Sequence, residues 1–168
     1  GSDVLSDVVE EAAEAGIIVV APAGAPTVNG FMSPGCADKT LSVGLSQPLA
    51  SNYPDMVVSG NPSTLGVAMA AAHVGAVAGL LWSEKPDASS EEVERALLET
   101  ADDTGFPVEQ QGFGQLNEYE AYIGFIGLTL EKLELDLEAL DESFLDSDAF
   151  KLLSDEEQER VKEFFKAR

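Results

Sequence analysis

The sequence predicts an α/β fold in which a mostly parallel sheet surrounds a buried apolar helix. Residues 66–82 are small and apolar on all sides, interrupted only by His73, and a helix that is apolar all round is typically buried. A helical pattern ending at Gly16 is followed at once by the β-branched run 17–21, which is apolar on both faces as a buried parallel strand would be. Helix, glycine and apolar strand together form half of an α/β unit.

The elements before the central helix follow from hydrophobic spacing. The first helix is predicted to direct five apolar residues inward, with glutamates on its outer face: Leu5, Val8, Val9, Ala12 and Ala13. Gly16 is a natural stop for this helix. Residues 40–45 alternate as a second strand, and residues 56–58 form a short third strand bounded by turn residues.

Beyond the central helix, capping residues mark each new element. Pro86 ends the apolar run, and Ser89 with Glu92 forms a capping box for an amphipathic helix. Its inward residues are predicted to be Val93, Ala96, Leu97 and Ala101. Residues 111–117 form a turn-rich return, and Asn117 is placed to cap a short helix over residues 118–122.

Residues 128–168 are predicted to be an acidic helical appendage, separate from a first domain over residues 1–127. Apolar residues from Leu130 to Phe144 follow a helical spacing, although Leu133, Leu135 and Leu137 also alternate as a strand would. A second helix follows the capping box of Ser154 and Glu157. The appendage either covers exposed core of the first domain or forms a helix pair that binds a partner.

Composition excludes several classes of function. The chain of 168 residues is 45% apolar, which is typical of a globular protein. Its 31 acidic and 9 basic residues give a formal charge of −22, so nucleic acid and anionic membrane surfaces are not expected partners. A halophilic source and ordinary surface acidity both fit this charge. We read the apolar run 65–82 as a core helix rather than a membrane span.

No cofactor or metal is expected. The single cysteine, Cys36, excludes an internal disulfide and is predicted to be a small packed side chain rather than a metal ligand or reactive thiol. The one histidine, His73, has no second metal-binding residue type near it in the sequence.

The start of the central helix resembles a known motif. Residues 66–74 read Gly-Val-Ala-Met-Ala-Ala-Ala-His-Val, which is similar to the nucleophile motif Gly-Thr-Ser-Met-Ala-x-Pro-His-Val of the subtilisin-like serine proteases (subtilases, peptidase family S8). Gly66, Met69, Ala70, His73 and Val74 match. Further landmarks of the second half of a subtilase domain follow in the same order over about residues 1–123, among them Gly24, Ser42-Val43-Gly44, Pro86-Asp87, Gly112, Gly114 and Asn117.

The resemblance implies a three-layer subtilase fold but argues against its chemistry. Ala68 stands at the position of the nucleophilic serine, and Ala25 at that of the oxyanion asparagine. A methyl group can neither attack a carbonyl nor donate a hydrogen bond. In the family the catalytic Asp and His lie in the first half of the domain, upstream of this chain, and His73 matches a structural, core histidine. Ser63 and Thr64 precede the motif but have no base.

Three functions remain open from the sequence. The first is an inactive, incomplete subtilase domain that acts as a structural or interaction module. The second is one half of a split or truncated serine endopeptidase that needs an N-terminal half for Asp and His. The third is a small acidic α/β module that binds protein through residues 128–168.

The sheet edge itself suggests a partner. A parallel sheet of half the family's extent leaves an unpaired strand edge, which favours association. The chain is therefore expected to self-associate when residues 128–168 are removed. The resemblance also implies that relatives are often secreted, but it does not locate this chain.

Overall fold

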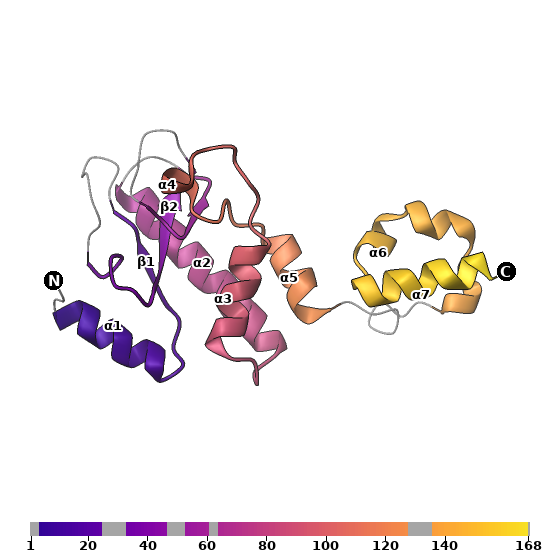
Figure 1. Cartoon of the computed structure of the whole chain (residues 1–168), viewed down its shortest axis with the longest axis horizontal. Helices are drawn as coiled ribbons and strands as arrows, with labels where there is room; N and C mark the ends of the chain where they lie inside the picture. The colour runs from indigo at the N-terminus through magenta and orange to yellow at the C-terminus, as the bar shows by residue number, and fades with distance from the viewer. Residues whose placement is uncertain (1–3, 25–32, 47–52, 61–63, 128–135, 168) are drawn as a thin grey trace. The chain divides into compact units, whose positions relative to one another are not determined.

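The computed structural model describes residues 4–24, 33–46, 53–60, 64–127 and 136–167. The chain divides into two compact units, Gly1–Ala121 and Tyr122–Arg168, which are described separately. Figure 1 labels the helices and strands of both.

The first unit contains a small parallel sheet, which confirms the predicted fold class. Helix α1 (Val4–Glu14) precedes β1 (Val19–Pro22), and β2 (Thr40–Leu45) and β3 (Met56–Val58) follow. The strand order is β1-β2-β3, with Val19 opposite Thr40 and Val43 opposite Met56. Gly16 ends α1 with a φ of +82°, a conformation that glycine adopts without steric cost. Every residue of β2 and β3 is buried.

Helix α1 buries less of its apolar surface than its spacing predicts. Val9 is buried, Ala12 and Ala13 are half-buried, and Leu5 and Val8 are exposed. The prediction that Leu5 and Val8 point inward is therefore wrong. The sheet contacts only one side of α1, through β1, and no described residue buries the adjoining apolar side.

Helix α2 (Thr64–Glu84) packs along β1 and β2 and also contacts α3 (Ser90–Glu99). Its sheet-facing side chains are buried: Val67, Ala70, Ala71, Val74, Val77, Ala78 and Leu81. The opposite side is exposed, so the prediction of a helix buried on all sides is wrong for half its circumference. Residues Gly66–Glu84 also meet the length and composition of a membrane span, although a core helix that packs on a sheet passes the same test.

The remaining helices of this unit begin at capping residues. Helix α3 (Ser90–Glu99) has the predicted capping box, in which the Ser89 hydroxyl accepts from the Glu92 N–H and the Glu92 carboxylate accepts from the Ser89 N–H. Val93 and Leu97 are fully buried, and Ala96 is half-buried. The four-residue α4 (Val108–Gln111) was not predicted, because one helical turn shows no apolar period. Helix α5 (Glu118–Ile126) extends beyond the predicted end.

Cys36 is exposed, which contradicts the prediction of a packed side chain. It lies in a turn between Ser33 and Lys39, and the turn directs the neighbouring Ala37 inward instead. Burial in a tight turn alternates between neighbours, and sequence spacing alone does not reveal which neighbour points inward.

The second unit has its own small hydrophobic core. Phe150, Leu153 and Val161 are buried together, and five partly buried side chains pack against them: Leu137, Leu140, Phe144, Leu145 and Phe165. Helix α7 (Asp155–Lys166) begins after Ser154, whose hydroxyl accepts from the Glu157 N–H, which is one of the two bonds of the predicted capping box. Helix α6 (Asp148–Lys151) precedes it.

The predicted continuous helix from Leu130 to Phe144 is wrong over its described part. Residues 128–135, including Leu130 and Leu133, lie outside the described residues. Beyond them are two short 3₁₀ helices, η1 (Leu137–Ala139) and η2 (Glu142–Asp146). The Asp136 and Asp141 carboxylates accept from the backbone N–H two residues on. Such local bonds compete with an α-helix for the same donors.

Candidate functional site

The predicted nucleophile position lies on the first turns of α2. Ala68 and Met69 are exposed, Met69 by 62%, and Gly66 is half-buried. Nothing is described for the side chain of Thr64, and Ser63 lies outside the described residues. The start of α2 therefore presents a methyl group to solvent at residue 68, where a hydroxyl would be needed for attack on a carbonyl.

The predicted oxyanion segment follows β1. Ala23 and Gly24 are buried, and Gly24 has a φ of +147°, in the region that glycine favours. Ala25, the predicted oxyanion position, lies outside the described residues. The structure thus locates the segment up to Gly24 and leaves the role of Ala25 a prediction.

His73 forms an exposed pair with a glutamate. Its Nε2 lies 2.8 Å from Oε1 of Glu118, the first residue of α5, and the two side chains are 43% and 56% exposed. The prediction of a hydrogen-bonded histidine is confirmed, but the prediction of a core position is wrong. His73 lies on the side of α2 that faces away from the sheet, and α5 covers it only in part. No hydroxyl is recorded on the imidazole in the described part of the chain.

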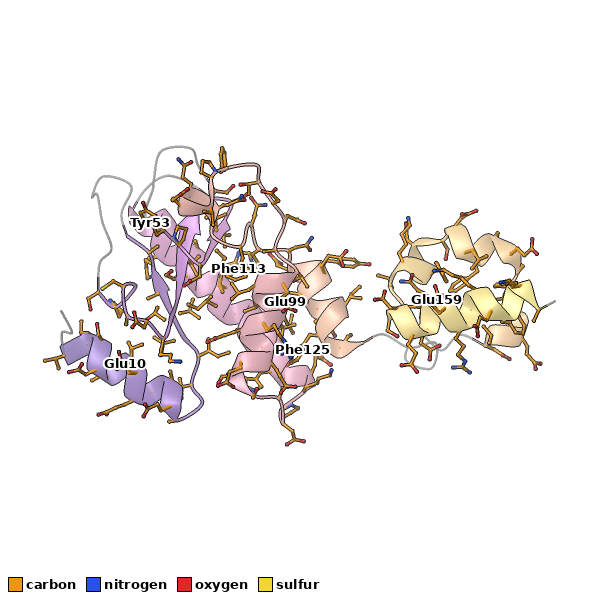
Figure 2. The ribbon with its side chains drawn as sticks, viewed as in Figure 1. Glu10, Tyr53, Glu99, Phe113, Phe125 and Glu159 are labelled. Atoms are coloured by element: carbon orange, nitrogen blue, oxygen red, sulfur yellow. The ribbon has the colours of Figure 1, made fainter. Side chains whose placement is uncertain are left out.

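Gly112 and Gly114 hold the turn-rich return against the end of the sheet. Both have positive φ, +61° and +132°. A Cβ on Gly112 would lie 2.2 Å from the carbonyl oxygens of Pro54 and Asp55, and one on Gly114 would lie 2.4 Å from that of Asp102. Phe113 N–H donates to the Asp55 carbonyl at 2.8 Å, and the exposed Phe113 ring is labelled in Figure 2. These two glycines have a structural role because only backbone fits there.

Asn117 links the return to α5. Its Nδ2 donates to the Asp102 carboxylate at 3.1 and 3.2 Å, and its Oδ1 accepts from the Glu120 N–H at 3.0 Å. The predicted cap is therefore present. The bond to Asp102 also ties the start of α5 to the segment that follows α3, where Asp102 pairs with Gln115.

The sequence reasoning missed a pair of polar residues between strands. The Asp55 carboxylate accepts from the Ser42 N–H at 2.7 Å and from the Ser42 hydroxyl at 2.6 Å, and Asp55 N–H donates back to the Ser42 side chain at 3.0 Å. A serine within an apolar strand was the available signal, because a buried hydroxyl needs a partner. Asp55 lies 13 residues after Ser42, so the neighbouring sequence did not show which residue is the partner of the hydroxyl.

Five carboxylates are among the residues that line a cavity of about 450 Å³: Glu14, Asp38, Asp55, Glu91 and Glu94. Its walls come from α1, β2, α3 and the turns before β2 and β3, and none of its lining residues belongs to α2. Glu94 of α3 is half-buried there, and burial first, then the charges of Glu91 and Asp55, raise its pKa above the ordinary value. Within the described residues, no group of three metal-binding side chains converges.

Among the residues that the structure describes, no proton-transfer relay surrounds Ala68. The only imidazole of the sequence bonds to Glu118, and the described carboxylates of the cavity lie among elements other than α2. The arrangement consists of the sheet, α2 and a return segment that packs closely on the sheet at Gly112 and Gly114.

Solved structures similar to this chain include proteases. Residues 52–115 match the model of the subtilase family. A protease structure from Pseudoalteromonas arctica PAMC 21717 is similar over 74% of this chain and 47% of its own length, with a TM-score of 0.62 and 21% identity. The self-cleaved protease domain of PatA aligns over 74% of this chain and 56% of its own length, with a TM-score of 0.58 and 21% identity.

The structure of the patellamide maturation protease PatA gives the same result, with a TM-score of 0.57, 20% identity, and coverage of 74% and 57%. The chain spans about half the length of these structures. At this identity the likeness shows the fold. The chain therefore has the α/β fold of the subtilase-like proteases, and residues 52–115 carry the sequence pattern of the subtilase family.

Proposed function

We propose that this chain is a subtilase-like domain without hydrolytic activity, which acts as a structural or protein-binding module. The observation that carries the proposal is the exposed methyl group of Ala68 at the start of α2, together with the pairing of the only histidine with Glu118. A serine hydrolase needs a nucleophile and a base in hydrogen-bond reach of each other. No described side chain supplies either half of that pair around Ala68.

The test is a serine-directed fluorophosphonate probe combined with a fluorogenic peptide substrate. We expect no labelling and no hydrolysis by the full chain, under conditions in which an active subtilase is fully labelled. Labelling of any residue, located by mass spectrometry, would overturn the proposal.

A split enzyme is the second candidate, because the chain spans about half the length of the proteases it resembles. In this case another polypeptide supplies Asp and His. The double variant Ala68→Ser and Ala25→Asn, mixed with an N-terminal subtilase half, should then hydrolyse the fluorogenic peptide. The matched control is Ala72→Ser, which adds a hydroxyl on the same exposed side of α2 one turn further along. Absence of hydrolysis with both variants would count against the split enzyme.

The second unit offers a separate binding element, since its core of Phe150, Leu153 and Val161 is internal to it. Deleting residues 128–168 distinguishes the two roles proposed for them. Loss of partner binding with the first unit still folded supports recognition, and unfolding of the first unit supports a covering role.

A further inference from the structure

The cavity of about 450 Å³ lies where the strands of the sheet begin. Its lining includes Thr40 and Leu41, the first two residues of β2, and Asp55, which directly precedes β3. The remaining walls come from the end of α1, from α3 and from neighbouring turns, and Figure 1 shows these two helices on either side of the strands. Helix α2 follows the opposite end of β3, so the cavity is separate from the region around Ala68.

The cavity belongs to the middle of the sheet rather than to its edges. At β3 the edge is covered by Gly114–Leu116, where Leu116 N–H donates to the Val57 carbonyl at 2.9 Å, and this segment does not line the cavity. No residue of β1 lines it either, and its strand residues come from β2, the central strand. The described residues alone therefore form its walls.

Negative charge dominates these walls. The lining contains five carboxylates and one basic residue, Lys39. Within the described residues, no hydrogen bond or ion pair is recorded for the carboxylates of Glu14, Asp38 and Glu94. Burial, and then the charges of Glu91 and neighbouring Asp55, raise the pKa of Glu94 in spite of Lys39. A cation bound here would gain interactions with carboxylates that have no partner among the described residues.

Apolar side chains lie among the carboxylates. Ile17, Leu41 and Leu98 also line the cavity; Leu41 is buried, Leu98 is half-buried and Ile17 is exposed. On α3 the lining positions are 90, 91, 94 and 98, a spacing that places them on one side of the helix. This side of α3 thus presents both carboxylates and an apolar side chain to a ligand.

The arrangement fits an extended organic cation better than a metal ion. A calcium ion takes about six to eight oxygen ligands around one point, and no group of three metal-binding side chains converges anywhere in the described chain. Small organic ligands occupy cavities of about 300–1,000 Å³, a range that includes this one. In a linear aliphatic amine, ammonium groups separated by methylene groups can pair with carboxylates on different walls.

We propose that this cavity binds a linear aliphatic polyamine, whose ammonium groups pair with the carboxylates of Glu14, Asp38 and Glu94 and whose methylene groups contact the apolar side chains between them. Binding offsets the mutual repulsion of the carboxylates and therefore stabilises the folded chain. The proposal goes beyond the proposed function, because it needs neither a nucleophile nor a protein partner.

Spermidine is the probe, titrated into the full chain by calorimetry at constant pH and salt concentration. Two control ligands separate its features: 1,8-octanediol has a similar length without charge, and hexaamminecobalt(III) has the same charge without methylene groups. We expect spermidine to bind at least tenfold more tightly than either control. Its binding should shift the NMR amide signals of Leu41, Ser90 and Leu98.

Two variants of α3 locate the site. Glu94→Gln should weaken spermidine binding about tenfold, the loss expected for one charge-assisted hydrogen bond. Glu99→Gln removes one charge from the same helix outside the cavity and should change the affinity less than about twofold. Asp38→Asn, in an exposed turn, repeats the test on another wall and should also weaken binding. Circular dichroism checks that all three variants fold.

Three outcomes would overturn the proposal. Equal affinity for spermidine and hexaamminecobalt(III) would show that net charge alone attracts them. Equal losses from Glu94→Gln and Glu99→Gln would show that the bound amine does not contact the cavity. Shifted amide signals confined to residues outside the cavity would assign binding to another surface. Fluorophosphonate labelling tests the proposed function separately, and its result does not affect these outcomes.

Discussion

The two sides of α2 have nearly the same composition and very different surroundings. The side toward the sheet carries valine, alanine and leucine, with Val74 and Leu81 fully buried. The outer side carries alanine, glycine, Met69 and Leu80, and these two larger side chains are 62% and 50% exposed. Small, uncharged residues therefore occur on both the buried side and the exposed side of α2. What separates the two sides is whether another element lies over them.

A regular spacing of apolar residues thus shows that one side of a helix can be buried. It does not show that another element actually covers that side. The sheet and α3 pack against α2, whose buried side chains run from Val67 to Leu81, and α5 reaches the outer side at His73 through Glu118. Matched substitutions on the two sides of α2 measure how much burial on each side contributes to stability.

The largest effect is expected from adjacent leucines on opposite sides. Leu81→Ala removes a fully buried side chain and should lower the free energy of unfolding by about 3 kcal/mol, since it leaves a cavity in the core. Leu80→Ala is the matched control and should cost less than about 1 kcal/mol, because Leu80 is half exposed. Urea unfolding followed by circular dichroism measures both. Equal losses would show that the outer side of α2 is packed as tightly as the inner side.

Two glycines extend the comparison from α2 to the return segment. Gly112→Ala should destabilise by about 2 kcal/mol, because it combines a positive φ with a Cβ 2.2 Å from backbone oxygens. Gly79→Ala meets nothing within 4 Å and lies inside a helix, so it should stabilise by about 0.5–1 kcal/mol. Thermal unfolding midpoints compare the two. A destabilising Gly79→Ala would reveal a close neighbour on the outer side.

Glu94 of α3 is an intermediate case, half-buried in the acidic cavity. Its pKa is raised by burial and by the neighbouring Glu91 and Asp55 charges, so the folded state holds the proton more tightly than the unfolded state. The carboxyl therefore favours folding at low pH, and this advantage is lost as the pH rises through the raised pKa. Glu94→Gln should raise stability at pH 7 by less than about 1 kcal/mol, a figure discounted for partial exposure.

The gain from Glu94→Gln should disappear below the ordinary glutamate pKa, where both states are protonated. Unfolding in urea at pH 7 and at pH 3.5 tests this, with Glu99→Gln on the exposed side of the same helix as the control. A gain of the same size at both pH values would rule out the titration of Glu94 as its cause.

The smallest effect is expected at the exposed pair on the outer side of α2. His73→Ala removes the bond to Glu118 and should change stability by no more than about 0.5 kcal/mol, since pairs this exposed contribute little and alanine favours the helix. Glu118→Gln, which keeps a side-chain acceptor for the imidazole, is the companion variant. A loss above 2 kcal/mol in a thermal unfolding series would mean that the histidine is in effect a core residue.

Much of the first unit could be predicted from the sequence because its signals are local. The limits of β2 and β3, the stop at Gly16, and the caps at Ser89 and Asn117 all depend on residues a few positions apart. The likeness to subtilases also came from contiguous residues, and the structure confirms it at the level of the fold.

The failures involve longer distances. Leu5, Val8, Cys36 and His73 were all expected to be covered, and each depends on an element that local spacing cannot position. The Ser42–Asp55 pair was missed for the same reason. In the second unit, aspartate side chains that bond to nearby backbone replaced an expected α-helix with 3₁₀ turns.

The sequence by itself determined the order of helices and strands from α1 to α3, the acidic charge of −22, and the methyl group at residue 68, because these are properties of composition and of near neighbours. The tertiary structure alone decided which side of α2 is covered, which partner His73 has, and which edge of the sheet the chain closes with Gly114–Leu116. The physical reason is that burial and strand pairing are contacts between segments far apart in the chain, and their energy depends on where those segments meet.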